Sequence, residues 1–151
     1  MHPTVHITLR NVDGETDPEG RSAEDYLASL DDGQLLADSH VLIDMMQRIS
    51  GEPPELWNVG TLRFGRYRYL YDSGRKGESH TIGFYPRRGR ITVYLMAATV
   101  RYPKLLSRLG RHTISRVYVK RLSDIDLSIL EQIVQQSYHY ITSQDGQMHR
   151  A

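Results

Sequence analysis

The chain has 151 residues, no cysteine and a formal net charge of +1, and 39% of its residues are hydrophobic. These proportions are those of an ordinary globular domain and exclude a collagen, a coiled coil and a disulfide-stapled scaffold. The absence of cysteine also excludes thiolate metal sites and thiol nucleophiles.

The first 60 residues predict a lead-in segment followed by two helices. Residues 1–21 contain glycine, proline and many charges, which indicates an extended or mobile lead-in whose residues 4–9 suit an edge strand. A first helix is predicted to begin after Ser22, whose hydroxyl can cap it, and to end at 31–33. A second helix is predicted over 34–49, because its apolar residues recur at helical spacing, with Gly51 as its C-terminal cap.

Beyond residue 60 the hydrophobic period becomes two, which predicts strands over 61–71, 80–85 and 90–97. The short connections between them, including the hairpin segment 73–77, imply antiparallel pairing. Gly65 is expected to mark a bulge that changes the side-chain alternation partway along the first strand.

A short helix over 103–109, a strand over 116–121 and a helix capped by Ser123 complete the predicted elements. The fold class is therefore α+β, a four-stranded antiparallel sheet with helices on one face, in the order ααβββαβα. We expect one domain over 22–143, with the lead-in at 1–21 and a disordered tail at 144–151.

One face of this sheet is predicted to stay open, because the helices cover only the other face. Alternation puts Tyr85, Tyr94 and Tyr118 on the open side, beside several arginines. The alternative is a second small core, covered by the lead-in or by a second copy of the chain. Trp57 is expected to be a core residue. The predicted contacts to an anionic ligand or a protein partner are Arg66, Arg68, Tyr85, Arg87, Arg88, Tyr94 and Tyr118.

Charge is sorted along the chain. Residues 1–60 carry a net charge of −9, residues 61–121 carry +13, and residues 122–151 carry −3. Twelve of the fifteen basic residues in the middle segment are arginine, which forms planar, bidentate contacts to carboxylate and phosphate. The pattern predicts either internal pairing of acidic helices with a basic sheet, or an anion-attracting surface.

Several sequence blocks, in this order, resemble the YdhG-like family of domains of unknown function. They are Trp57, Phe64–Tyr69, Tyr71–Gly77, Gly83–Arg88, Tyr102 with Leu105-Leu106, Leu109–His112 and Tyr118–Asp126. The resemblance covers about residues 22–142 and implies a small, frataxin-like α+β sandwich. One relative is regarded as an iron chaperone. The segment Thr113–Arg116 departs from the family pattern by being shorter and lacking a glycine, which argues against an anion-binding role for it.

Iron binding of the frataxin type would use oxygen donors from an acidic ridge on the first two predicted helices. The candidate metal ligands are Glu24, Asp25, Asp31, Asp32 and Asp38. The alternative for acidic residues near helix starts is capping and solvation. Apart from iron, no cofactor is predicted.

An enzyme is not predicted, because no nucleophile with an adjacent base and no phosphate-binding loop is recognisable. Interleaved arginines and tyrosines are also typical of stacking platforms, so single-stranded nucleic acid is a further alternative partner. His112 is expected to be a hydrogen-bonded structural residue.

The first residues show no signal peptide, and the most apolar uncharged run, Ile91 to Val100, is too short to span a bilayer, which needs about 20 residues. We therefore expect a cytoplasmic protein with no membrane partner, either a monomer or a homodimer.

Overall fold

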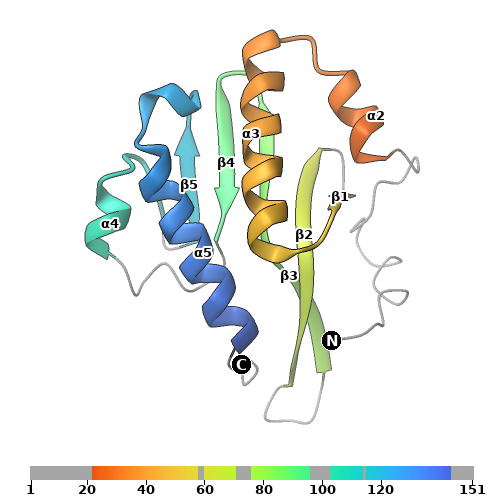
Figure 1. The fold of residues 1–151 in the computed structure, drawn as a ribbon, viewed down its shortest axis with the longest axis vertical. Helices are drawn as coiled ribbons and strands as arrows, with labels where there is room; N and C mark the ends of the chain where they lie inside the picture. The colour runs from red at the N-terminus through yellow and green to blue at the C-terminus, as the bar shows by residue number, and fades with distance from the viewer. Residues whose placement is uncertain (1–21, 58–59, 71–75, 96–102, 114, 144–151) are drawn as a thin grey trace.

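Five antiparallel strands form one sheet, and their order in space is their order in the chain. The computed structural model describes residues 22–57, 60–70, 76–95, 103–113 and 115–143, with the side chains of 67–70, 76–80, 103, 141 and 143 excepted. The helices are α2 (Ala23–Ala28), α3 (Gly33–Ser50), α4 (Pro103–Ser107), the 3-10 turn η2 (Leu122–Asp124) and α5 (Leu127–Ser143). The strands are β1 (Pro54–Trp57), β2 (Thr61–Leu70), β3 (Lys76–Arg87), β4 (Arg90–Tyr94) and β5 (Arg116–Val119) (Figure 1).

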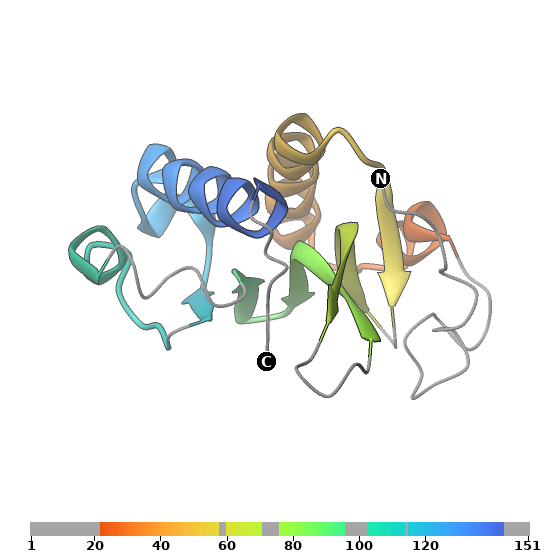
Figure 2. The same ribbon diagram turned by 90° about the horizontal axis from the view of Figure 1, so that it is seen from below.

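The two long helices, α3 and α5, lie side by side on one face of the sheet (Figures 1 and 2). The short helix α2 contacts β1 at one sheet edge, and α4 contacts α5 near the other. Neither long helix lies on the opposite face of the sheet (Figure 2). The arrangement confirms the α+β class. Within the described part of the chain, no helix has the length and apolar character needed to cross a membrane.

The hydrophobic core lies between the sheet and the two long helices. The pairing register aligns Leu62, Phe84, Val93 and Val117 in one row across β2 to β5. Because side chains alternate along each strand, this row and its same-side neighbours make one face of the sheet apolar. The row is fully buried, as are Leu42 and Met46 of α3 and Leu130 and Ile133 of α5.

The helix ends follow from local capping chemistry. Ser22 accepts a hydrogen bond from Asp25 N at 3.0 Å and caps α2, as predicted. Asp32 accepts from Leu35 N at 3.0 Å and begins α3. Gly51, with φ of 73°, ends α3 in the left-handed conformation that glycine adopts without a steric cost, also as predicted.

The predicted count of four strands is wrong, because Pro54–Trp57 forms a fifth strand, β1, at the sheet edge. This segment is four residues long and begins with a proline that has no N–H to donate. Proline is tolerated only at edges and strand starts, so the segment lacked a strand signal of its own. β1 exists because β2 offers it an unpaired edge.

Two further predictions about local structure are wrong. The cap of α5 is not Ser123, which lies in η2; instead Asp126 accepts from Ser128 N at 3.1 Å and from Ser128 Oγ at 2.7 Å. The hydrogen bond from the Ser128 hydroxyl holds the pKa of Asp126 below its ordinary value. Gly65 has φ of 72°, yet the pairing of β2 with β3 continues past it in the same register, so no residue is inserted there.

The outer edge of β5 is partly protected by the segment that follows α4. Tyr118 N donates to Arg111 O at 3.0 Å, and Thr113 N donates to Arg116 O at 2.9 Å. Such pairing blunts an edge that would otherwise present free backbone donors and acceptors. In the same segment His112 Nδ1 lies 2.8 Å from Gly110 O, consistent with a structural role. The predicted strand at 4–9, the tip of the 73–77 hairpin and the tail at 144–151 lie outside the described residues.

Candidate functional site

The sheet face opposite the long helices carries a row of aromatic and threonine side chains that crosses all five strands. Trp57 of β1 pairs with Thr61 of β2, and Tyr85 of β3 pairs with Thr92 of β4, which pairs with Tyr118 of β5. The register that joins Leu62 to Phe84 brings Thr61 beside Tyr85. In this row, aromatic rings therefore stand on alternate strands.

A second row runs beside the first and is rich in charge. It consists of Glu55, Arg63, Gly83, Tyr94 and Arg116, one from each strand. Tyr94 lies between two arginines in this row, with the guanidinium carbons of Arg63 and Arg116 at 5.5 and 5.6 Å from its ring centre. We call the exposed part of the two rows, with the arginines stacked on it, the Tyr–Arg face; it comprises Tyr85, Arg87, Arg90, Tyr94, Arg111, Arg116 and Tyr118.

Each tyrosine of the Tyr–Arg face has at least one guanidinium over its ring. Arg87 lies 5.2 Å from the centre of Tyr85. Arg90 and Arg111 lie 5.0 and 5.8 Å from the centre of Tyr118. Attraction between a cation and the negative face of an aromatic ring holds such pairs together with about 0.5–1 kcal/mol at exposed sites. The rings thus position the cations and limit their motion.

The three tyrosines are half-buried, and the four arginines of the Tyr–Arg face are exposed. The tyrosines are therefore not sealed inside the chain. In the two rows the described carboxylate is Glu55, and its oxygens are both 3.0 Å from Arg66 Nη2. The positive charge of the Tyr–Arg face consequently has no described carboxylate against it.

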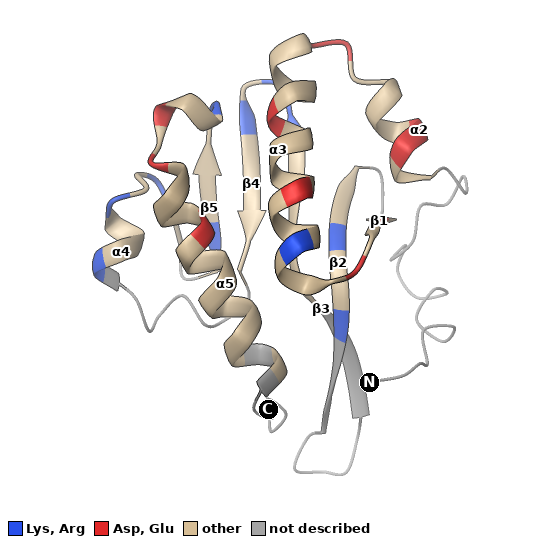
Figure 3. Ribbon diagram, viewed as in Figure 1, with Lys and Arg blue, Asp and Glu red and all other residues tan. Residues whose placement is uncertain are grey.

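The segregation of charge seen in the sequence is also spatial. Figure 3 shows acidic residues on α2, α3 and α5 and basic residues on the strands and α4; Arg48 on α3 and Glu55 on β1 are exceptions. Among the described ion pairs, Arg88 to Asp32, at 3.9 Å, is the one that joins the sheet side to the helical layer, and it runs from the turn after β3 to the N-cap of α3. Arg48 pairs with Glu131 at 2.8 Å within the helical layer. The contacts in the described region therefore give little support to internal pairing of acidic helices with a basic sheet.

At the β1 edge, Trp57 is 2% exposed, which confirms that it is a buried core residue, although it packs outside the main hydrophobic cluster. Its indole Nε1 donates to Glu55 at 3.3 Å, and Arg63 and Arg66 lie 5.8 and 5.2 Å from its ring. Two residues three apart in a regular strand point to opposite faces. Both arginines reach Trp57 because the backbone turns at Gly65.

The predicted partner contacts separate into groups. Tyr85, Arg87, Tyr94 and Tyr118 come together on the Tyr–Arg face. The side chain of Arg66 is 16% exposed and forms an ion pair with Glu55 of β1, so it belongs to the β1 edge. Arg88 lies in the turn after β3 and faces Asp32 at the start of α3. The side chain of Arg68 lies outside the described residues.

Three arginines of the Tyr–Arg face were absent from the predicted contacts. Arg90 is four residues from Tyr94 in β4, and Arg116 is two residues from Tyr118 in β5. Side-chain alternation along the strands was therefore enough to place both arginines on this face. Arg111 carried no such signal, because it reaches Tyr118 only through the chain segment that pairs with the β5 edge.

The five predicted metal ligands do not form one site. Asp32 caps α3, while Glu24, Asp25 and Asp31 are exposed around α2. Asp38 is buried, and its two oxygens accept from Gln34 Nε2 at 2.9 Å and from Leu122 N at 3.1 Å. Throughout the described ranges, no three His, Asp or Glu side chains gather as metal ligands would. Iron binding stays a prediction from the sequence, and Asp38 serves to join α3 to η2.

Replacing Asp38 by asparagine is expected to lower the free energy of unfolding by about 1–3 kcal/mol. The amide keeps one acceptor but turns an N–H donor toward Gln34 or Leu122, where a carboxylate oxygen now accepts. Urea unfolding measures the loss. The matched control is Asp44→Asn on the exposed side of α3, which should change stability by less than about 0.5 kcal/mol. Equal effects of the two changes would contradict the bridging role.

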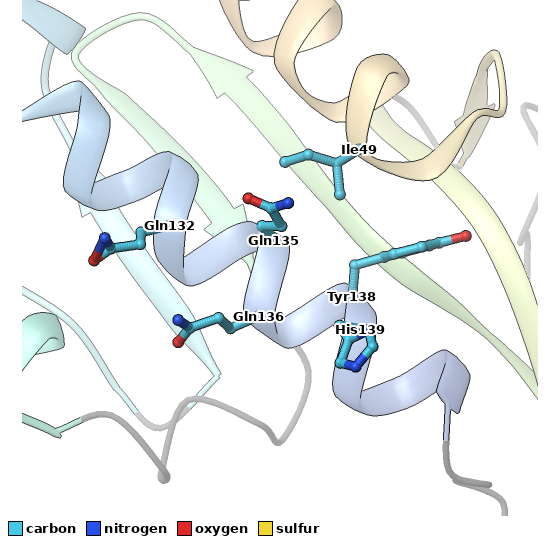
Figure 4. Close-up of a pocket in the computed structure, with 6 residues that line it drawn as sticks. All are labelled: Ile49, Gln132, Gln135, Gln136, Tyr138 and His139. Atoms are coloured by element: carbon cyan, nitrogen blue, oxygen red, sulfur yellow. The ribbon is translucent and has the colours of Figure 1, made fainter.

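A hollow of about 420 Å³ lies elsewhere, on the helical layer at the C-terminal ends of α3 and α5 (Figure 4). It is lined by Ile49, Gln132, Gln135, Gln136, Tyr138 and His139. Tyr138 OH donates to Ser50 O at 3.2 Å, and burial raises the pKa of this phenol. The tyrosine thereby ties α5 to the end of α3, and neutral amides provide most of the remaining lining. The described lining contains no lysine or arginine.

Comparisons of the chain with protein-family models, with curated proteins and with solved structures return no match. The resemblance to the YdhG-like family therefore stays a prediction from the sequence. The function must be argued from the Tyr–Arg face itself.

Proposed function

We propose that the chain is a small, non-enzymatic binding module that holds an extended anionic partner on the Tyr–Arg face. The observation that carries the proposal is the set of four exposed arginines stacked on half-buried tyrosines. The tyrosines beneath these cations alternate with core residues of β3 to β5, so they lie on the sheet face that α3 and α5 leave uncovered.

Stacked arginine is well suited to this task. A guanidinium that lies over a ring keeps its N–H donors at its edge, where they reach carboxylate or phosphate oxygens in a bidentate manner. The ring also restricts the side chain before binding, so less conformational entropy is lost when an anion arrives. Cations repeated across three strands favour a partner with repeated negative charges over a single small anion.

Binding of inorganic polyphosphate tests this proposal directly. The affinity is expected to fall steeply with salt concentration, because the polyanion releases counterions when arginines neutralise it. The double variant Arg90→Gln/Arg116→Gln should bind about tenfold or more weakly, since charged hydrogen bonds contribute about 1.5–3 kcal/mol each. Isothermal titration calorimetry at several salt concentrations provides both numbers.

The matched control removes the same charge from the helical side, with Arg48→Gln/Arg121→Gln. These two arginines lie on α3 and at the start of η2, where they face Glu131 and Asp124. Their loss should weaken binding only by the general change in net charge. Equal weakening by both double variants, or no polyphosphate binding at low salt, would contradict the proposed function.

A further inference from the structure

We infer that the anionic partner is a single-stranded nucleic acid whose bases stack on the tyrosines while its phosphates meet the arginines. This inference rests on the proposed function and specifies its ligand. It is carried by the spacing of the rings, by their pairing with cations and by the side chains that surround them.

The three tyrosines form a zigzag across neighbouring strands. Tyr94 pairs with Gly83 and Arg116, so Tyr85 and Tyr118 are each two residues beyond a direct partner of Tyr94. Such diagonal neighbours lie about 7–8 Å apart. That is roughly twice the 3.4 Å step of a stacked strand, so the rings suit an unstacked strand with each base held separately.

Each step of the zigzag also carries positive charge. Arg87 lies over Tyr85, Arg116 over Tyr94, and Arg90 with Arg111 over Tyr118. The face therefore repeats one aromatic ring and at least one guanidinium per step. A nucleotide repeats one planar base and one phosphate. When a phosphate draws a guanidinium off its ring, the base takes the place of that guanidinium on the ring face, so both parts of the repeat find a counterpart on the protein. Polyphosphate and acidic peptides match only the charges.

The surroundings of the rings argue against a protein partner. Protein interfaces are themselves enriched in tyrosine and arginine, but their cores are also largely apolar. Among the described residues, the one large aliphatic side chain that is well exposed is Val41, at 40%, and it belongs to α3 on the helical layer. The face thus offers stacking and charge but no aliphatic anchor.

The test compares three probes of equal length and equal charge on the intact chain. They are a fluorescent 12-nucleotide DNA single strand, an abasic strand with the same phosphates, and a glutamate-only peptide, each measured by anisotropy. Loss of the bases is expected to weaken binding about 5- to 100-fold, because a stacked base contributes strongly and independently of sequence. A blunt duplex of the same strand should also bind more weakly, since its paired bases cannot reach the rings.

The double variant Tyr94→Leu/Tyr118→Leu should weaken binding of the base-bearing strand by the same factor and weaken polyphosphate binding clearly less, because polyphosphate loses only the positioning of the arginines by the rings. Tyr140→Leu on α5 is the matched control and should change neither affinity. Because the abasic probe needs no variant, the inference stays testable even if the double variant fails to fold. Equal affinity for the abasic and base-bearing strands, or tighter binding of the glutamate peptide, would overturn the inference and leave the proposed function standing. If no polyanion binds, both are overturned.

Discussion

Replacing Phe84 by alanine is expected to lower the free energy of unfolding by about 3–5 kcal/mol. Phe84 is fully buried at the centre of the apolar row, paired with Leu62 on one side and Val93 on the other. The truncation removes most of a ring from contact with the core and leaves a cavity that the strands on either side cannot fill. Unfolding in urea, followed by circular dichroism, measures the loss.

The control for this prediction is Val41→Ala, which shortens an aliphatic residue that is 40% exposed on α3. It should change stability by no more than about 0.5 kcal/mol. A loss below about 1 kcal/mol for Phe84→Ala would show that the core between the sheet and the long helices is not packed as described.

The change Gly83→Ala is expected to destabilise the fold by about 2–3 kcal/mol, although it adds only a methyl group. A Cβ at this position would lie 2.6 Å from the backbone oxygen of Leu62 and 3.1 Å from Arg63 Cα. Because these are backbone atoms, β2 and β3 must move apart to make room. Chemical denaturation gives the stability, and amide exchange should report weakened pairing of β2 with β3.

Gly33→Ala is the matched control, since a Cβ there meets nothing within 4 Å. Alanine at the first position of α3 should leave stability unchanged or raise it slightly by reducing the freedom of the unfolded chain. Should both alanine variants unfold at the same urea concentration, the close approach of Leu62 to Gly83 would be disproved.

The Tyr–Arg face and the core are consequences of the same alternation. Phe84 and Val93 face the helices, and their neighbours Tyr85 and Tyr94 face away. The pairing that aligns the core row therefore also aligns the tyrosines, and movement of β2 or β3 would disturb both. Variants of the face should accordingly be tested for stability before a change in affinity is attributed to lost ligand contacts.

Most elements were predictable because their signals are local. Helical spacing of apolar residues, the Ser22 cap and the Gly51 cap define the first two helices, and the change to a period of two defines β2 to β5. β3 begins earlier than predicted. Lys76–Ser79 has no apolar alternation in its sequence, and it becomes part of the strand through its pairing with β2. β1 was missed for a related reason, since its pairing depends on an edge that exists only in the folded sheet.

The sequence by itself determined the α+β class, the sides on which Tyr85, Tyr94 and Tyr118 lie and the concentration of arginine between residues 61 and 121, because strand alternation and charge order are properties of neighbouring residues. Only the tertiary structure decided which arginines stack on which rings, the role of Asp38 as a bridge, and the pairing of Arg111 with Tyr118. Those contacts join residues brought together by sheet register and helix packing. Their distances in space are therefore not encoded in their spacing along the chain.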